Sequence, residues 1–257
     1  MAPITPKIVG IFIGWNSGHL SEVLGLSVAN MALLKAFLQH SKVDRWHIFL
    51  PSKIYANLRE QCRGLLEHLD SNDILDKVDF FRDYDLVDCL STVPYWAFQL
   101  GDPLIGQWLQ LREAVSPKLF PITGVTHSLD SLSQNTWRQE IVFSTPTPAD
   151  AVVCSCEAGK QVMQRVARTL LPEGSAFEQN LTVIPLAVED PYEQLPQNIS
   201  KEQAKEHLGL PSDRPLVLVL GRITLLRKAD LHPLLVAIKM IKDDWPQDHA
   251  KPVFLIA

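Results

Sequence analysis

Short apolar runs alternate with longer amphipathic segments along most of the chain. The apolar runs predict strands at residues 7–13, 46–50, 78–81, 119–125, 151–155 and 182–185. The amphipathic segments between them predict helices at residues 20–39, 54–69, 103–114 and 157–171. Strands that alternate with helices in this way form a parallel sheet covered by helices on both faces. The pattern therefore predicts an α/β fold.

The alternation is interrupted once and then restarts. Residues 187–200 are rich in proline and polar side chains, which is typical of a linker. Ser200 is a suitable N-cap for a helix at residues 201–208. A strand at residues 216–220, a helix and a strand at residues 252–256 come next. The sequence therefore predicts a first domain, a linker with a bridging helix, and the start of a second domain, at residues 1–186, 187–212 and 213–257.

The predicted second domain has few elements. Residues 213–257 contain only two predicted strands and one helix, which cannot cover their own apolar faces. We therefore expect this domain to be incomplete and the chain to be truncated within it. The alternative is a small extension that packs onto the first domain.

The composition describes an ordinary globular protein. The 257 residues are 46% hydrophobic and 21% charged, and the formal net charge is −5. A general nucleic-acid binder needs a basic surface, so we expect no nucleic-acid partner. No apolar run approaches the roughly 18–20 residues of a membrane span, and the amino terminus lacks the features of a signal peptide. These features predict a cytoplasmic protein and leave peripheral contact with a membrane open.

The four cysteines form neither a disulfide pattern nor a zinc-binding pattern. Strand alternation places Cys154 and Cys156 on one face of the run AVVCSC at residues 151–156, so we expect both to be buried as small apolar side chains. No cluster of histidines and carboxylates has the spacing of metal ligands. We therefore expect neither a metal ion nor another cofactor.

Residues 216–235 have the features of an anion-binding site. An apolar strand ends at Gly221 and Arg222, and Lys228 opens the helix that follows. The two cations would meet above the end of the strand, beside a helix N-terminus whose free N–H groups already favour negative charge. This arrangement predicts the binding of a diphosphate. Two solvated cations in a loop are the alternative.

A loop with two glycines follows the first predicted strand. Gly14, Trp15, Gly18 and His19 lie in this loop, just before the first predicted helix. Gly18 would let backbone N–H groups approach an anion closely at the start of that helix. The spacing is not G-x-G-x-x-G, which argues against a nicotinamide cofactor. An ordinary turn is the alternative.

One histidine and three aromatic residues are further candidates for a site. His127 follows the predicted strand at residues 119–125 and would project from the carboxyl edge of the sheet, where open α/β folds bind ligands. A packed or surface histidine is the alternative. The rings of Trp15, Tyr95 and Trp96 suit stacking on a sugar, although packing in a core is the commoner use of such rings.

Three segments of the chain together resemble one enzyme family. They are Gly-Arg followed by Lys-Ala-Asp within residues 221–230, ADAVVCSCEAGKQVM at residues 149–163 and TVIPLAVED at residues 182–190. Their order and spacing are similar to those of the retaining nucleotide-sugar glycosyltransferases with two Rossmann-like domains (the GT-B fold), particularly glycosyltransferase family 4, also called group 1. The resemblance spans nearly the whole chain. The chain departs from the family pattern by having Cys156 in place of a serine and Ala187 and Ala229 in place of glycines.

The resemblance implies a function as well as a fold. Members of this family transfer a sugar from a nucleoside-diphosphate sugar to an acceptor hydroxyl, with retention of the anomeric configuration. For this chain, the resemblance implies that Arg222 and Lys228 stabilise the departing diphosphate. It also implies that His127 contacts the donor sugar or stabilises the reacting centre.

The resemblance also assigns the two domains. The loop with Gly14 and Gly18 would face the donor phosphates, with Trp15 and His19 on the side of a carbohydrate or other hydroxyl acceptor. The first domain would bind this acceptor, and residues 213–257 would begin the nucleotide-sugar-binding domain. A Glu-x7-Glu segment that holds the sugar and ribose in the family has no counterpart here. We therefore expect negligible turnover from these 257 residues alone.

Two other functions stay open at this point. The first is a non-catalytic module, or a remnant of a transferase, that binds a sugar or a phosphate. The second is a nucleotide-dependent epimerase or dehydrogenase, against which the absence of the glycine fingerprint argues.

Overall fold

The protein is described by a computed structural model that divides into two compact units, Met1–Ala187 and Val188–Ala257. The structure describes residues 6–12, 25–67, 72–127, 129, 146–171, 176–187, 199–221, 223, 230–246 and 249–256. Within these residues, the first unit contains a seven-stranded sheet and the second unit a two-stranded sheet.

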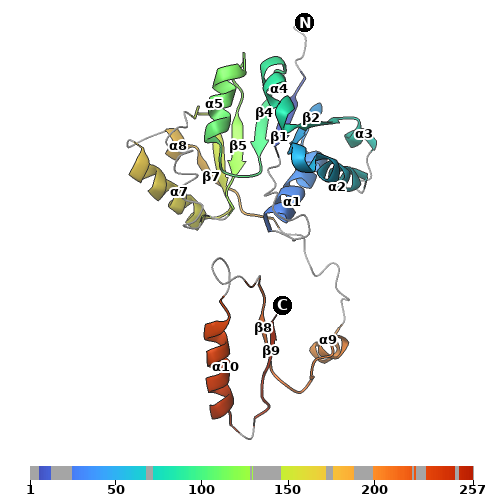
Figure 1. The fold of residues 1–257 in the computed structure, drawn as a ribbon, viewed down its shortest axis with the longest axis vertical. Helices are drawn as coiled ribbons and strands as arrows, with labels where there is room; N and C mark the ends of the chain where they lie inside the picture. The colour runs from blue at the N-terminus through green and yellow to red at the C-terminus, as the bar shows by residue number, and fades with distance from the viewer. Residues whose placement is uncertain are drawn as a thin grey trace. The chain divides into compact units, whose positions relative to one another are not determined.

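A parallel sheet forms the centre of the first unit (Figure 1). Its strands are β1 (Ile8–Phe12), β2 (Arg45–Leu50), β3 (Val78–Arg82), β4 (Ala97–Leu100), β5 (Ile122–Val125), β6 (Ala151–Cys154) and β7 (Leu181–Val183). They lie in the order β3-β2-β1-β4-β5-β6-β7, and every neighbouring pair is parallel. This is the order of a doubly wound, Rossmann-like sheet, so the predicted α/β fold class is confirmed.

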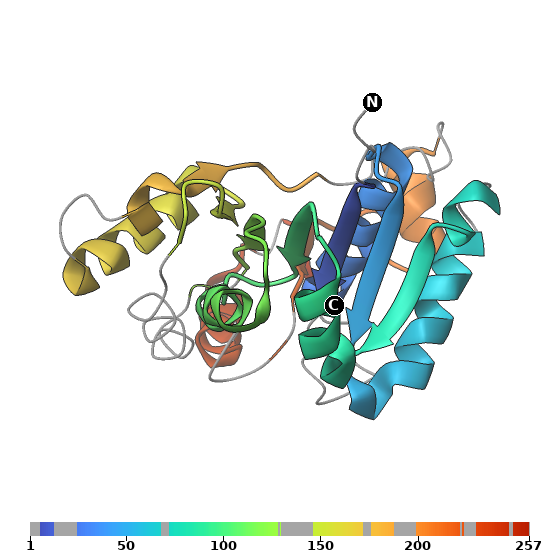
Figure 2. The same cartoon turned by 90° about the horizontal axis from the view of Figure 1, so that it is seen from above.

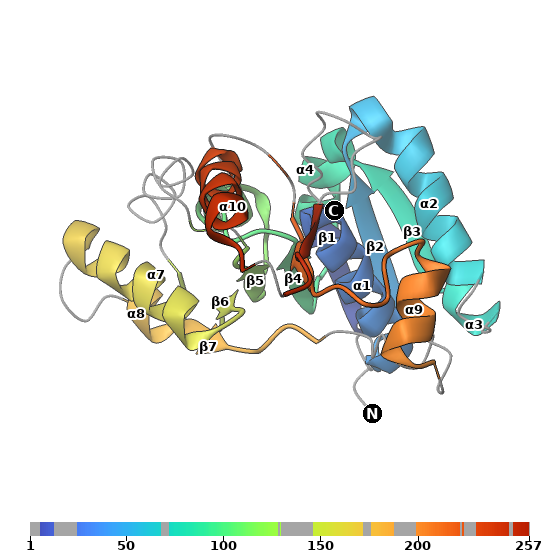
Figure 3. The same cartoon turned by 90° about the horizontal axis from the view of Figure 1, so that it is seen from below.

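Helices connect the strands and cover both faces of the sheet. The longer ones are α1 (Gly25–His40), α2 (Tyr55–Glu67), α4 (Leu86–Thr92), α5 (Gly106–Val115) and α7 (Glu157–Leu170). The shorter ones are α3 (Asn72–Leu75), α8 (Ala176–Gln179) and 3-10 turns at Ser52–Ile54 and Asp83–Asp85. Figure 2 shows α2 and α4 on opposite sides of strands β1 to β3. Figure 3 shows α7 and α8 beside β6 and β7.

Side-chain alternation along the strands divides the core into two parts. In β2, Ile48 and Leu50 are buried against α1 and α2, whereas Phe49 is buried against the layer that contains α4 and α5. The part of the core on the side of α4 and α5 is rich in aromatic rings, and one of these rings lies against β1 at Gly10. A Cβ atom on Gly10 would lie 2.3 Å from Cδ2 of Phe98, so only glycine fits under this ring.

The second unit contains a strand–helix–strand element. Strands β8 (Leu216–Val219) and β9 (Val253–Ile256) are parallel, and α10 (His232–Asp244) lies between them in the sequence. Helix α9 (Lys201–His207) precedes them and begins with a capping box between Ser200 and Gln203. Large apolar side chains are exposed on β8 and α10, namely Val217, Leu218, Leu235, Val236, Met240 and Ile241.

The observed elements differ from the sequence prediction at several places. The apolar pattern does not predict β4 or α4. The strand expected at residues 119–125 begins only at Ile122, and Leu119, which is 69% exposed, lies outside it. The helix expected at residues 103–114 begins only at Gly106, since a turn closed by Asp102 precedes it. The linker expected at residues 187–200 lies largely outside the described residues.

Candidate functional site

The carboxyl ends of β1 and β4 form the switch point of the sheet. The strand order runs from β1 through β2 to β3 on one side, and from β4 to β7 on the other. In open α/β sheets, ligands bind in the crevice outside the carboxyl ends of the strands at such a point. Among the described residues, those directly after β4 and β5 are therefore placed to meet a ligand.

Most of the predicted site residues fall outside the described part of the chain. These are Gly14, Trp15, Gly18, His19, Arg222 and Lys228. Their roles in binding the diphosphate and the acceptor therefore stay predictions from the sequence. His127 is described, and it is the second residue after the end of β5.

The imidazole of His127 is held by the backbone at the end of β4. Its Nε2 atom lies 2.9 Å from the carbonyl oxygen of Gly101, and the ring is half-buried. A carbonyl oxygen can only accept, so Nε2 must carry the proton and donate this hydrogen bond. In the neutral ring, Nδ1 is then an acceptor. Among the described residues, no hydrogen-bond donor meets Nδ1.

Burial sets the charge state of His127 and its neighbour Asp102. Burial lowers the pKa of His127, although the hydrogen bond to Gly101 and the charge of Asp102 oppose this shift. Burial also raises the pKa of Asp102, whose carboxylate accepts a hydrogen bond from the N–H of Leu104 at 2.9 Å. The lowered pKa favours a neutral imidazole near pH 7, which suits hydrogen bonding to a hydroxyl group better than binding of an anion.

Gly101 connects three elements at the switch point. Its N–H donates to the carbonyl of Phe12 at the end of β1, with an N–O distance of 3.2 Å, while its own carbonyl accepts from His127. Asn30 of α1 occupies the space beside its Cα atom. A Cβ atom on Gly101 would lie 2.6 Å from Nδ2 of Asn30. The position therefore requires glycine for reasons of space.

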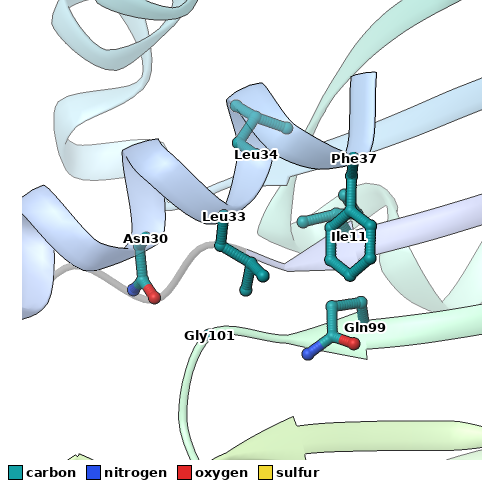
Figure 4. A pocket seen from close by; sticks show the side chains of 7 residues that line it. All are labelled: Ile11, Asn30, Leu33, Leu34, Phe37, Gln99 and Gly101. Atoms are coloured by element: carbon teal, nitrogen blue, oxygen red, sulfur yellow. The ribbon is translucent and has the colours of Figure 1, made fainter. Parts of the chain in front are cut away.

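A small cavity adjoins Asn30 between α1 and the strands β1 and β4. Its volume is about 10 Å³, and Figure 4 shows the side chain of Asn30 pointing from α1 toward Gly101. Asn30 is 3% exposed, and no donor among the described residues bonds its Oδ1 atom. The sequence analysis missed both Asn30 and Gly101. Only the pairing of β1 with β4 brings them together, and the apolar pattern does not predict β4.

The start of α7 lies at the same carboxyl edge. The hydroxyl of Thr126 accepts a hydrogen bond from the N–H of Ser155 at 3.3 Å. Cys156 is the N-cap of α7, and its sulfur accepts from the N–H of Gly159 at 3.3 Å. Cys154 is buried but Cys156 is exposed, so the prediction that both are buried is wrong for Cys156. The strand ends at Cys154, and its alternation does not extend into the helix cap.

The two described aromatic candidates lie at the amino end of β4, away from this edge. Tyr95 is buried, and its hydroxyl lies 2.9 Å from Nδ1 of His47. Trp96 is exposed, and the ammonium group of Lys7 lies 5.4 Å from its ring centroid. The core interpretation is therefore confirmed for Tyr95, and neither ring is placed to line the carboxyl edge.

The described part of the chain contains neither a metal-binding cluster nor a membrane-spanning helix. No group of three or more His, Cys, Asp and Glu side chains within it is arranged to hold a metal ion. The expectation of a metal-free protein stays a prediction. No helix within the same residues is both long enough and apolar enough to cross a bilayer.

Comparison with known proteins gives matches among solved structures. No protein-family model matches the chain, and no curated protein matches its sequence. Anabaena Alr3699/HepE in complex with UDP matches with a TM-score of 0.53 and 13% identity, over 96% of this chain and 61% of that chain. The same protein with UDP and glucose matches with a TM-score of 0.51 and 12% identity, over 96% and 60% of the two chains.

The complex of Alr3699/HepE with UDP-glucose gives a similar result. Its TM-score is 0.52 at 12% identity, over 97% of this chain and 69% of that chain. The chain spans about three-fifths of the length of the first two structures and about two-thirds of the third. At this level of identity the likeness concerns the fold, and it confirms the GT-B-like α/β architecture predicted from the sequence.

Proposed function

We propose that this protein is a glycosyltransferase that transfers a sugar from a nucleoside-diphosphate sugar to an acceptor hydroxyl, with retention of configuration. The observation that carries the proposal is the place of His127. Its imidazole lies at the carboxyl edge of a Rossmann-like sheet, beside the switch point between β1 and β4. The similar fold of Alr3699/HepE, solved with UDP and with UDP-glucose, supports a nucleotide sugar as the ligand class.

In this proposal, His127 contacts the sugar as a neutral hydrogen-bond acceptor. Its Nε2–H is used by Gly101, which leaves Nδ1 to accept from a hydroxyl of the donor or the acceptor. Such a contact fixes the orientation of the reacting groups, and misplacement by about 1 Å can lower a rate by up to 10²-fold. His127 is therefore assigned to orientation and to stabilisation of the reacting centre.

The departing diphosphate is assigned to residues proposed from the sequence. Negative charge builds on this group as the bond to the sugar breaks. Arg222 and Lys228 would stabilise this charge more in the transition state than in the ground state, without a metal ion. Gly14 and Gly18 would offer backbone N–H groups to the same phosphates. Loss of one such donor commonly lowers a rate by about 10²–10³-fold.

The acceptor is assigned to the first unit, with Trp15 and His19 as candidates for contact. We propose a carbohydrate or another hydroxyl compound as the acceptor and the cytoplasm as the location. Peripheral contact with a membrane is compatible with this assignment.

Titration with nucleoside diphosphates tests the proposal. UDP, GDP and ADP are added separately while the unfolding temperature is followed, and UDP-glucose is then added with candidate acceptors. We expect one nucleoside diphosphate to raise the unfolding temperature, because a ligand that binds only the folded state stabilises it. In a chain that carries a complete nucleotide-sugar-binding domain, Arg222→Ala should lower turnover far more than ligand affinity. Absence of stabilisation by all three diphosphates, or turnover unchanged in both Arg222→Ala and His127→Ala, contradicts the proposal.

A further inference from the structure

We propose that Asn30 is a positioning residue for His127, acting through the peptide group of Gly101. Asn30 lies in α1, Gly101 directly follows β4, and His127 lies just after β5, so the three come from distant parts of the chain. The proposal rests on the proposed function in that it takes His127 to contact the substrate. The physical coupling of Asn30 to the imidazole can be measured without any substrate.

The peptide of Gly101 is held from three sides. Its N–H is bonded to the carbonyl of Phe12 at 3.2 Å, and its carbonyl is bonded to Nε2 of His127 at 2.9 Å. On the third side, a Cβ atom on Gly101 would lie 2.6 Å from Nδ2 and 2.9 Å from Cγ and Oδ1 of Asn30. These are the three heavy atoms nearest to that position. Asn30 is therefore the side chain that limits how Gly101 can shift or turn.

Stability alone does not account for an asparagine at this position. Asn30 is 3% exposed, and its Oδ1 atom has no donor among the described residues. The adjoining cavity of about 10 Å³ is lined mainly by apolar side chains of α1 and β1. An unpaired buried acceptor is destabilising, so an apolar side chain that fits the space would be more stable.

The shape of the amide gives a reason for asparagine. The amide group is planar and can lie flat beside the Cα atom of Gly101, whereas the tetrahedral Cγ of a leucine would carry two methyl groups out of that plane. The contact keeps the Gly101 carbonyl aimed at Nε2 of His127. This carbonyl selects the Nε2–H tautomer and leaves Nδ1 as the acceptor for a substrate hydroxyl.

A set of variants tests the coupling from both sides of the contact. Asn30→Ala removes the amide, and Gly101→Ala places a Cβ atom where the amide lies. The double variant removes the amide and adds the Cβ atom, so the new methyl group has room. Leu33→Ala is the matched control, because Leu33 lies on the same helix and lines the same cavity. The tautomer of His127 is read from two-bond proton–nitrogen NMR spectra, with the signals assigned from His127→Gln.

We expect the wild type and Leu33→Ala to hold His127 in the Nε2–H tautomer. Asn30→Ala and Gly101→Ala should each raise the population of the Nδ1–H tautomer severalfold. The tautomer populations of His127 in the double variant should be closer to those of the wild type than the populations in Gly101→Ala are, because the two changes involve one contact. In a chain that carries a complete nucleotide-sugar-binding domain, Asn30→Ala should lower kcat by about 10-fold and up to 10²-fold while changing KM little, which is the effect of a misplaced catalytic group.

The outcomes separate the coupling from the proposed function. A shifted tautomer supports the coupling whether or not the chain transfers a sugar, whereas absence of transferase activity from a chain that carries a complete nucleotide-sugar-binding domain overturns the proposed function. An unchanged tautomer in Asn30→Ala, with a loss of stability like that of Leu33→Ala, overturns the coupling and makes Asn30 a packing residue. Where Asn30→Ala does not fold, Asn30→Leu takes its place. It removes the unpaired acceptor and should still shift the tautomer, because its methyl groups leave the plane of the amide, and an unchanged tautomer there overturns the proposal.

Discussion

Arg112 and Asp150 form a buried, bidentate ion pair that connects α5 to the start of β6. The Nη1–Oδ1 distance is 2.6 Å and the Nη2–Oδ2 distance is 3.0 Å. The carboxylate also accepts from the N–H of Ile122 at 2.7 Å and from the N–H and hydroxyl of Thr147. Asp150 belongs to the segment that resembles the glycosyltransferase family, and here its contacts join strands β5 and β6. Its role in this structure is to hold the sheet together.

Removal of the arginine should destabilise the fold strongly. Arg112→Met leaves a carboxylate that is 0% exposed without its cation, which typically costs about 3–5 kcal/mol. Urea denaturation measures this loss. The control is Arg168→Met, because the Arg168 side chain, which pairs with Glu178, is 62% exposed and this pair should contribute little. Equal losses in the two variants would show that burial of the first pair does not matter.

The same carboxylate should make stability depend on pH in acid. Burial alone would raise the pKa of Asp150, but hydrogen bonds from Arg112, Ile122 and Thr147 outweigh burial and lower it. The unfolded chain takes up this proton near pH 3.9, about the ordinary value, and the folded protein only at lower pH. The stabilisation is therefore present above about pH 3.9 and lost as the pH falls through the folded pKa. Asp150→Asn should lose less stability than the wild type in this range, as measured by urea melts.

His127 should make stability fall at mildly acidic pH. Burial lowers its pKa, so below about pH 6.5 the unfolded chain binds a proton that the folded protein does not. Stability from this residue is present above about pH 6.5 and declines as the pH falls toward the folded pKa. The raised pKa of Asp102 acts oppositely, because its folded carboxyl keeps a proton that the unfolded chain has lost. It therefore lowers stability as the pH rises from about 3.9.

The unfolding temperature of His127→Gln should therefore change less than that of the wild type between about pH 7 and pH 5. His47, whose pKa is also lowered by burial, is present in both proteins and does not affect the comparison. A steeper dependence in His127→Gln would mean that the folded imidazole is charged.

Replacement by alanine should have opposite effects on stability at two glycines. Gly10→Ala places a methyl group 2.3 Å from Cδ2 of Phe98 in the aromatic layer, and overpacking of this kind typically costs about 1–3 kcal/mol. Gly64 lies inside α2 with no atom within 4 Å of the new Cβ position. Gly64→Ala should stabilise the protein by roughly 0.5–1 kcal/mol, because alanine favours the helix. The denaturation midpoints of the two variants measure these effects. A shift of both midpoints in the same direction from the wild type would contradict the structure.

The cap of α7 should improve when its sulfur is replaced by oxygen. Cys156→Ser keeps the acceptor for the N–H of Gly159 and supplies a side chain that is preferred at this position. Cys156→Ala removes the acceptor and should cost about 0.5–1 kcal/mol relative to the serine variant. Thermal unfolding of the three proteins should rank serine first, cysteine second and alanine last. Equal unfolding temperatures would show that this bond does not contribute.

The sequence predicts most of the sheet because strands buried on both faces appear in it as short apolar runs. It does not predict β4, because Gln99 interrupts the run. In the fold, the amide of Gln99 donates to the carbonyl of Leu100 at 2.7 Å and accepts from the hydroxyl of Thr123. A polar residue satisfied by tertiary contacts therefore looks like the end of a strand when only the sequence is considered.

The candidate site was predictable only in part, because β4 does not appear in the sequence as an apolar run. The place of His127 follows from the strand before it, and this strand is an apolar run. The contacts of Gly101 with His127 and Asn30 depend on β4 and on its pairing with β1. No spacing in the sequence indicates these contacts, since the partners lie on three separate elements.

The pairing of β1 with both β2 and β4 has a consequence for the newly made chain. Val9 pairs with Trp46 on one side and with Ala97 on the other, so β1 receives its second neighbour only after residue 97 has been synthesised. Until then, an open strand edge faces the space that β4 later fills, and such edges are prone to pair with other chains. Ribosome stalling between β3 and β4 should therefore leave a nascent chain that aggregates or recruits chaperones.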